Sequence, residues 1–127
     1  MDLDLSRVAD AEYVLLTTFR TTGEPVGTPV WVAPDGDELL VTTGAASGKV
    51  KRLRHTPRVT LVPCDARGRV VAEAEAVEAS AVVRDDEETR ARLERALERK
   101  YGVKYRMLRA TRKLKRTPDT SVPLVIS

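Results

Sequence analysis

The chain has 127 residues, of which 42% are hydrophobic, and a formal net charge of +3. This length suits one domain, spanning residues 1–127, with a core of modest size. Cys64 is the single cysteine and His55 the single histidine, which excludes an internal disulfide, a four-cysteine metal site and any metal site that needs two histidines of one chain. The first ten residues contain three aspartates, and no stretch approaches the apolar length of a membrane span, so we expect a cytoplasmic protein without a signal peptide.

The first third of the chain predicts a short helix followed by strands. We expect an amphipathic helical lead-in at residues 4–10 and strands at residues 13–21, 26–33 and 39–43. Pro29 cannot donate a ladder hydrogen bond, so the second of these strands must be bulged there or lie at a sheet edge. Asp35 and Gly36 tolerate positive φ and predict a tight hairpin before the third strand. Tight turns between the three strands predict a meander.

The pattern then changes to helix and back to strand. The small-residue turn Gly44–Ser47 precedes a short helix, which the Ser47 side chain can cap. Val50 and Leu53 fall on one side of this helix. Pro57 ends it, because the residue before a proline avoids the helical conformation. We expect the next strands at residues 59–64 and 70–83.

The last part of the chain predicts basic helices and a final strand. Asp85 and Glu88 form a predicted capping box, and apolar residues at helical spacing continue to Tyr101. A second helical segment follows Gly102, with an expected buried stripe of Met107, Leu108, Thr111 and Leu114. The final strand is expected at residues 122–126. Residues 99–116 hold nine Lys or Arg residues and no acidic one. Such a run favours an anionic partner, and the alternative is a helix face whose cations are simply exposed to solvent.

These elements together predict a mostly β fold of the α+β class. Six strands, mostly antiparallel, combine with two to three helices that flank them. A closed or nearly closed barrel suits so many short strands, because closure hides the strand edges from other chains.

Residues 42–54 carry the pattern that most directly indicates chemistry. A strand end, a small-residue turn, a hydroxyl and a cation-bearing helix start follow one another, and such an arrangement attracts phosphate. The cations are expected to contribute in the order Lys49, Arg52 and Lys51, with the Ser47 hydroxyl donating and Gly48 allowing close approach of the ligand. A capped surface helix with solvated lysines explains the spacing equally well, since no strict P-loop spacing is present.

The run TTGAASGKVKRLRHTPRVTLVPCD, preceded by GTPVWVAPDGDELLV, resembles the pyridoxamine 5′-phosphate oxidase-like split-barrel superfamily. Within it the chain is most similar to the small actinobacterial group that depends on the deazaflavin coenzyme F420. The resemblance implies a split β-barrel homodimer with the cofactor in a groove between subunits. It also implies cofactor contacts, with Ser47 and Lys49 at the phosphate, Thr42 and Thr43 at the strand end beside it, and Thr28, Pro29, Val30 and Trp31 along the ring pocket.

Departures from the superfamily pattern favour F420 over FMN. Gly48 stands where the FMN-using oxidases usually carry an arginine, and Val26–Ala33 lacks the cations of their second strand. Their C-terminal Trp and Arg substrate motif is missing as well. The resemblance therefore implies an F420-dependent reductase that passes hydride to a small organic substrate. The basic residues 99–116 are an additional candidate for holding the poly-glutamate tail of that coenzyme, with a solvated helix face as the alternative.

Two other functions remain open at this point. The first is a non-catalytic carrier or sensor that binds FMN, F420 or haem, because the residues name no acid–base pair and leave the catalytic residues unknown. The second is a nucleic-acid-binding barrel, which the composition disfavours. Sheets that read single strands stack bases on exposed aromatic side chains, and this chain has only five aromatic residues.

Overall fold

A computed structural model describes the backbone of residues 3–114 and 121–127, and the side chains of residues 5–108, 110 and 121–127. The helices are α1 (Leu3–Ala9), α2 (Gly48–Leu53), α3 (Glu87–Tyr101) and α4 (Val103–Leu114). The strands are β1 (Tyr13–Phe19), β2 (Pro25–Val30), β3 (Ala33–Asp35), β4 (Glu38–Gly44), β5 (Arg58–Cys64), β6 (Val77–Val83) and β7 (Ser121–Ile126). The predicted mostly β, α+β fold is confirmed.

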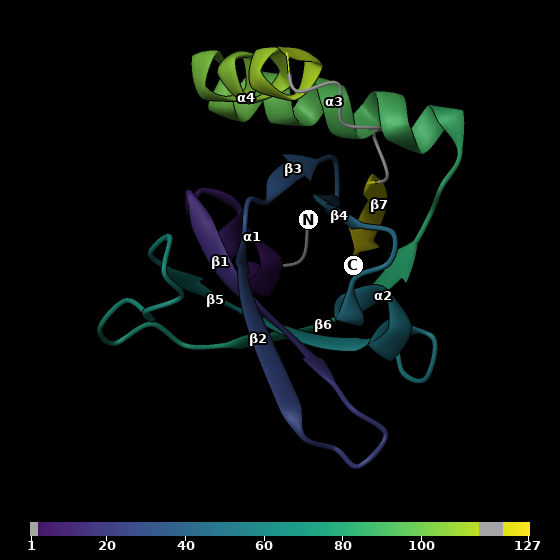
Figure 1. Ribbon diagram of the computed structural model, residues 1–127. Coiled ribbons are helices and arrows are strands. Elements are labelled where there is room, and N and C mark those ends of the chain that lie inside the picture. Colours follow the sequence, from purple (N-terminus) through teal and green to yellow (C-terminus); the bar gives the residue numbers. More distant parts are fainter. Residues whose placement is uncertain (1–2, 115–120) are drawn as a thin grey trace.

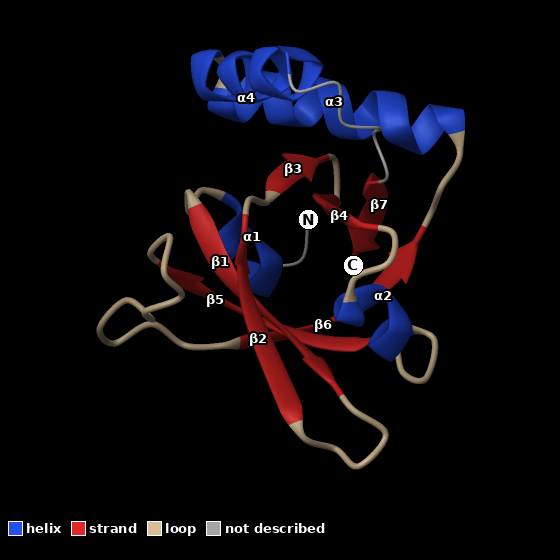
Figure 2. Cartoon of the chain, viewed as in Figure 1, coloured by secondary structure: helices blue, strands red, loops and turns tan. Residues whose placement is uncertain are grey.

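The strands form one curved sheet in the order β2-β1-β5-β6-β7-β4-β3, and each of these neighbouring pairs is antiparallel. The sheet bends around a common interior, and α3 and α4 lie next to each other beyond β3 and β4 (Figure 1). Figure 2 shows that helix and strand are segregated, with α2 at the end of β4 and the longer helices on one side. β2 is an edge strand, which is where Pro29 was expected to be tolerated.

The two hairpins were predicted correctly, but the meander was wrong. β1 pairs with β2, and β3 pairs with β4 through a turn in which Gly36 has a φ of 60°. β2 and β4 are not paired in the sheet, since the two partners of β4 are β3 and β7. The expected strand at residues 26–33 is split at Val32. Its N–H donates to the Tyr101 hydroxyl at 3.1 Å and its carbonyl accepts from Lys100 Nζ at 2.5 Å, so side chains of α3 replace ladder partners there. This split gives seven strands in the described residues rather than six.

The expected strand at residues 70–83 was too long at its start. β6 begins at Val77, and residues 71–76 lie outside the strand, with a turn at Ala72 and Glu73 in which Glu73 has a φ of 66°. Val70 forms only an isolated bridge with Cys64, and its side chain is 48% exposed. Alanines that alternate with glutamates offer little apolar area to bury, so nothing in this segment stabilises an extension of the sheet.

Two groups of buried residues hold the fold together. The interior of the curved sheet is filled mainly by Leu and Val side chains, and α1 contributes to it with Leu5, Val8 and Ala9. A second group lies between α3 and the sheet and consists of Ala33, Leu40, Leu93, Ala96, Leu97 and Val125. Trp31, Tyr101 and Tyr105 pack against the second group, which attaches α3 to β3, β4 and β7.

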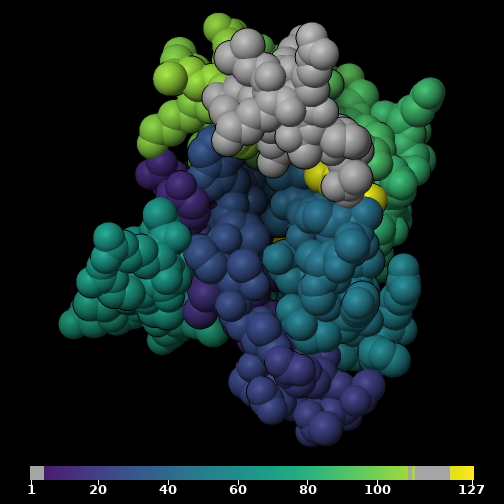
Figure 3. Space-filling view, viewed as in Figure 1, coloured from purple at the N-terminus to yellow at the C-terminus, as the bar shows by residue number. Residues whose placement is uncertain are grey.

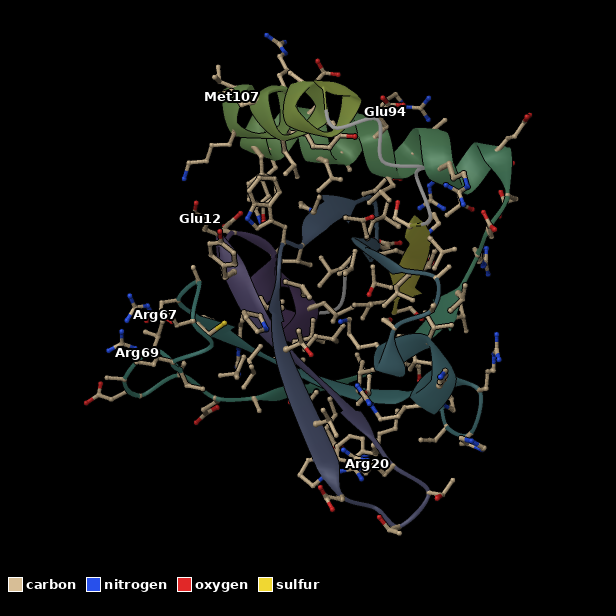
Figure 4. The ribbon with its side chains drawn as sticks, viewed as in Figure 1. Glu12, Arg20, Arg67, Arg69, Glu94 and Met107 are labelled. Atoms are coloured by element: carbon tan, nitrogen blue, oxygen red, sulfur yellow. The ribbon has the colours of Figure 1, made fainter. Side chains whose placement is uncertain are left out.

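The helical region differs from expectation in two places. The capping residue of α3 is Asp86, not Asp85, and its carboxylate accepts from Thr89 N at 2.9 Å. The buried stripe predicted on α4 is wrong for Met107 and Leu108, which are 65% and 39% exposed, because Tyr105 supplies the inward contact instead. Figure 4 shows Met107 on the outer side of α4. The side chains of Thr111 and Leu114, also in that stripe, lie outside the described residues.

Candidate functional site

The candidate site begins where β4 gives way to α2. Thr43, the last residue but one of β4, is buried, and its Oγ1 lies 3.3 Å from the Oγ of Ser47. Ser47 occupies the N-cap position of α2 with extended backbone angles, but its side chain makes no capping hydrogen bond. The expected side-chain cap is therefore wrong. The Ser47 hydroxyl instead pairs with that of Thr43, so two hydroxyls gather at the start of the helix. Thr42 is half-buried and, as the neighbour of Thr43 in β4, lies on the opposite face of the strand with Leu40.

Arg52 is held against the sheet by a buried hydroxyl. Its Nε donates to Thr18 Oγ1 at 2.5 Å, and Thr18 lies on β1 with no exposed surface. The guanidinium also lies over Gly48, because a Cβ atom built at position 48 would be 2.6 Å from Arg52 Nη1. Gly48 thus provides the space into which the Arg52 side chain folds. The result is a fixed cation beside the first turn of α2.

Lys49 is a half-buried cation next to Arg52. Burial, and secondarily the Arg52 guanidinium, lower the pKa of the Lys49 ammonium below its ordinary value. Among the described residues, none forms a hydrogen bond or ion pair with the Lys49 side chain. A bound anion would compensate both the loss of water and the repulsion from Arg52. Lys51, by contrast, is exposed and faces an open depression on the other side of Arg52.

The residues expected to line a ring pocket do not share one wall. Directly paired residues of antiparallel strands point to the same face, so Thr28 opposite Leu16 lies on the face where Arg52 reaches Thr18. Val30 lies on that face as well, because it pairs with Val14. Pro29 lies on the opposite face, where its ring is 3.7 Å from the position of a Cβ on Gly68. The structure therefore brings Thr28 and Val30 to the side of Arg52, but not Pro29.

Trp31 lies in an aromatic group under α3. Its ring stacks on Tyr101 with centroids 4.2 Å apart and planes 8° from parallel, and Tyr13 is 6.4 Å away at a tilt. One face of the indole is thus covered by Tyr101. Burial raises the pKa of the Tyr101 phenol to about 12. The neutral phenol accepts from Val32 N and donates to the carbonyl of Glu12 at 2.7 Å.

Sequence reasoning missed two residues that shape this region. Thr18 was treated as part of a strand, although a threonine that alternates with the inward-facing Val14 and Leu16 signals a buried hydroxyl in need of a partner. Lys100 was counted among the basic residues 99–116. Its ammonium instead donates to the carbonyls of Ala9, Ala11 and Val32 at 2.7, 2.6 and 2.5 Å. No sequence signal could have indicated contacts that span so much of the chain.

The described residues contain neither a group of metal ligands nor a helix that could span a membrane. Across residues 3–114 and 121–127, no three His, Cys, Asp or Glu side chains are grouped so that they could hold a metal ion. In the same part of the chain, no helix has both the length and the apolar character needed to cross a bilayer.

Comparison with known proteins decides the family. The model of the pyridoxamine 5′-phosphate oxidase family matches residues 5–124, nearly the whole chain. The chain belongs to this family. Solved structures match the fold of this family member. No curated protein matches it in sequence.

The neighbours share the fold of this family member at low sequence identity. A conserved hypothetical protein from Mycobacterium tuberculosis matches with a TM-score of 0.71 and 19% identity, over 100% of this chain and 79% of the other. A FAD-binding protein from Mesorhizobium loti matches with a TM-score of 0.63 and 15% identity, over 99% and 88%. The haem storage protein HutZ from Vibrio cholerae matches with a TM-score of 0.60 and 11% identity, over 99% and 88%. These likenesses show the fold of the family.

Proposed function

We propose that the protein binds a phosphate-bearing flavin or deazaflavin cofactor at the junction of β4 and α2. One observation carries this proposal: Lys49 is a half-buried ammonium whose pKa is lowered and which has no acidic partner among the described residues. A phosphate group there would accept hydrogen bonds from Lys49 and from the Ser47 hydroxyl. Arg52 would add a second positive charge from its fixed position on Thr18.

The charge of this site fits a phosphodiester better than a phosphomonoester. A phosphomonoester carries about −1.5 to −2 charges at neutral pH, whereas a diester carries one. The face of β2 turned to Arg52 carries Val26, Thr28 and Val30, none of which is a cation, and position 48 is a glycine. Fewer cations therefore converge here than in the FMN-using oxidases that the sequence resembles. This supports F420, with FMN as the alternative.

With reduced F420 bound, the cofactor would supply the hydride and the protein would act as an F420-dependent reductase of a small organic substrate. The chain itself contributes three things. Lys49, Ser47 and Arg52 anchor the phosphate, Thr43 shapes the strand end beside it, and Thr28 and Val30 extend the wall along β2. Lys51 is the weakest of the proposed cofactor contacts, because its side chain is exposed.

A homodimer completes this proposal. An apolar groove of about 270 Å³ lies next to α2, lined by Val50, Leu53, Arg54, Pro57, Ala81, Val82 and Val83. Val82 and Val83 are 43% and 37% exposed, so a second subunit packed here would remove apolar surface from water. Because the groove adjoins the helix that carries Lys49, the partner would also close one side of the cofactor site.

A non-catalytic cofactor carrier or sensor is the second candidate. It is favoured by the surroundings of Lys49, because Arg52 is the charged group that shifts the Lys49 pKa and no carboxylate or histidine of a described residue contributes to that shift. The structural neighbours of this chain include one protein named for FAD binding and one named for haem storage. Binding of F420 without turnover of any electron acceptor would support the carrier.

Equilibrium binding to the purified protein tests the proposed site. We expect F420 to bind more tightly than FMN, and Lys49→Ala to weaken binding at least about tenfold, because a charged hydrogen bond contributes about 1.5–3 kcal/mol. Arg67→Ala removes an equal charge from the exposed loop between β5 and β6 and should leave binding unchanged. Equal affinities of the wild-type protein and Lys49→Ala would refute the site. Oxidation of reduced F420 against a panel of acceptors then separates the reductase from the carrier.

A further inference from the structure

An open depression of about 410 Å³ lies between the turn that joins β1 to β2 and the helix α2. Its lining residues are Arg20, Thr21 and Thr22 from the turn and Gly48, Lys51, Arg52 and His55 from α2 and its end. Figure 3 shows the turn and the α2 segment next to each other at the lower part of the molecule, and Figure 4 shows Arg20 on that hairpin. The described lining residues include three permanent or near-permanent cations and no carboxylate.

The cations that line this depression are weakly compensated. Arg20 has an acidic partner in Glu24, but both side chains are more than half exposed and their atoms are 3.5 Å apart, which makes the pair weak. Lys51 forms no ion pair with any described residue. Arg52 uses its Nε on Thr18, which leaves its two terminal nitrogens over Gly48, between the depression and Lys49.

We propose that this depression is a second anion subsite, which binds a phosphoryl or carboxylate group of the same cofactor whose first phosphate lies at Lys49. This inference rests on the proposed function. Gathering like charges without a carboxylate costs free energy that a bound anion repays. The hydroxyls of Thr21 and Thr22 add neutral donors beside the cations. Arg52 lies between the two positions, so its terminal nitrogens serve both anionic groups.

Three cofactors that differ in their second anionic group test the subsite. FMN has one phosphate, FAD has a diphosphate, and F420 has a phosphodiester followed by glutamate carboxylates. We expect the double variant Arg20→Ala, Lys51→Ala to weaken FAD or F420 binding at least about fivefold and FMN binding less than about twofold. Weaker binding of FAD identifies a diphosphate as the occupant, and weaker binding of F420 identifies its carboxylate tail. The selective loss should shrink at high ionic strength, because exposed charges are screened.

The matched control is the double variant Arg67→Ala, Arg69→Ala. It also removes two exposed cations, one of which pairs with an acidic residue four positions away in the chain, at 3.3 Å, as Arg20 does. Both control residues lie on the loop that projects from the opposite side of the molecule (Figure 4). The control should leave the affinities of all three cofactors unchanged.

Each other outcome overturns the subsite. An equal loss for FMN would mean that these cations act on the first phosphate, and no loss beyond that of the control would mean that the depression binds nothing. Selective loss in both double variants would reflect net charge alone. If the wild-type protein binds none of the three cofactors, the proposed function fails together with the subsite, whereas binding of FMN alone removes only the subsite.

Discussion

Replacing Gly48 by alanine tests how Arg52 is held. A Cβ atom at position 48 would lie 2.6 Å from Arg52 Nη1 and 3.3 Å from its Cζ, so the guanidinium must move away. We expect that movement to break the 2.5 Å hydrogen bond from Arg52 Nε to Thr18 Oγ1, which would leave a fully buried hydroxyl without its partner. Loss of a hydrogen bond to a charged group costs about 1.5–3 kcal/mol.

The backbone effect of the same substitution has the opposite sign. Alanine is favoured over glycine by about 1 kcal/mol in the interior of a helix and by less in the first turn, where position 48 lies. The free energy of unfolding should therefore fall by about 1–2 kcal/mol in Gly48→Ala. In an Arg52→Ala background no guanidinium opposes the Cβ, and Gly48→Ala should raise the free energy of unfolding by about 0.5 kcal/mol.

Urea denaturation of the wild-type protein, both single variants and the double variant measures this reversal of sign. The coupling between positions 48 and 52 is the difference between the two effects of Gly48→Ala. The same four proteins should show weaker cofactor binding whenever Arg52 is displaced or absent. An effect of Gly48→Ala that is the same in both backgrounds would refute the reasoning, because the glycine would then have no part in placing Arg52.

Two predictions concern the contacts that hold α3. Lys100→Met removes the donor to the carbonyls of Ala9, Ala11 and Val32 and should lower the free energy of unfolding by about 2–4 kcal/mol. The control Arg99→Met, at the exposed neighbouring residue, should change it by less than about 0.5 kcal/mol. Similar losses in both variants would contradict the role of Lys100. The pKa of Tyr101 rises from 10.0 to about 12 on folding, so its contribution to stability is complete below pH 10 and is lost between pH 10 and about 12. Urea denaturation across this range should show a smaller alkaline loss for Tyr101→Phe than for the wild-type protein, and parallel curves would show that this phenol is not responsible.

Local sequence patterns predicted most of the secondary structure. The turn at Asp35 and Gly36 needs positive φ, a preference of the residues themselves, so the β3–β4 hairpin could be predicted without knowing its surroundings. The same holds for the change from β4 to α2, where small residues and a serine precede apolar residues at helical spacing. The candidate cofactor residues Ser47, Gly48, Lys49 and Arg52 lie within that short segment, so they could be named from the sequence, and their role stays a proposal.

Strand order and the position of Arg52 depend on contacts between residues that are distant in sequence. β4 pairs with β7, the last strand of the chain. The break between β2 and β3 at Val32 is stabilised by Lys100 and Tyr101, which lie 68 and 69 residues further on. The placement of Arg52 depends in the same way on Thr18, 34 residues before it. Periodicity reports which side of an element is apolar, but not which other element covers it. The sequence by itself therefore determined the elements and their turns, whereas only the tertiary structure decided the strand order and the position of Arg52, because both arise from side chains that meet after the chain has folded.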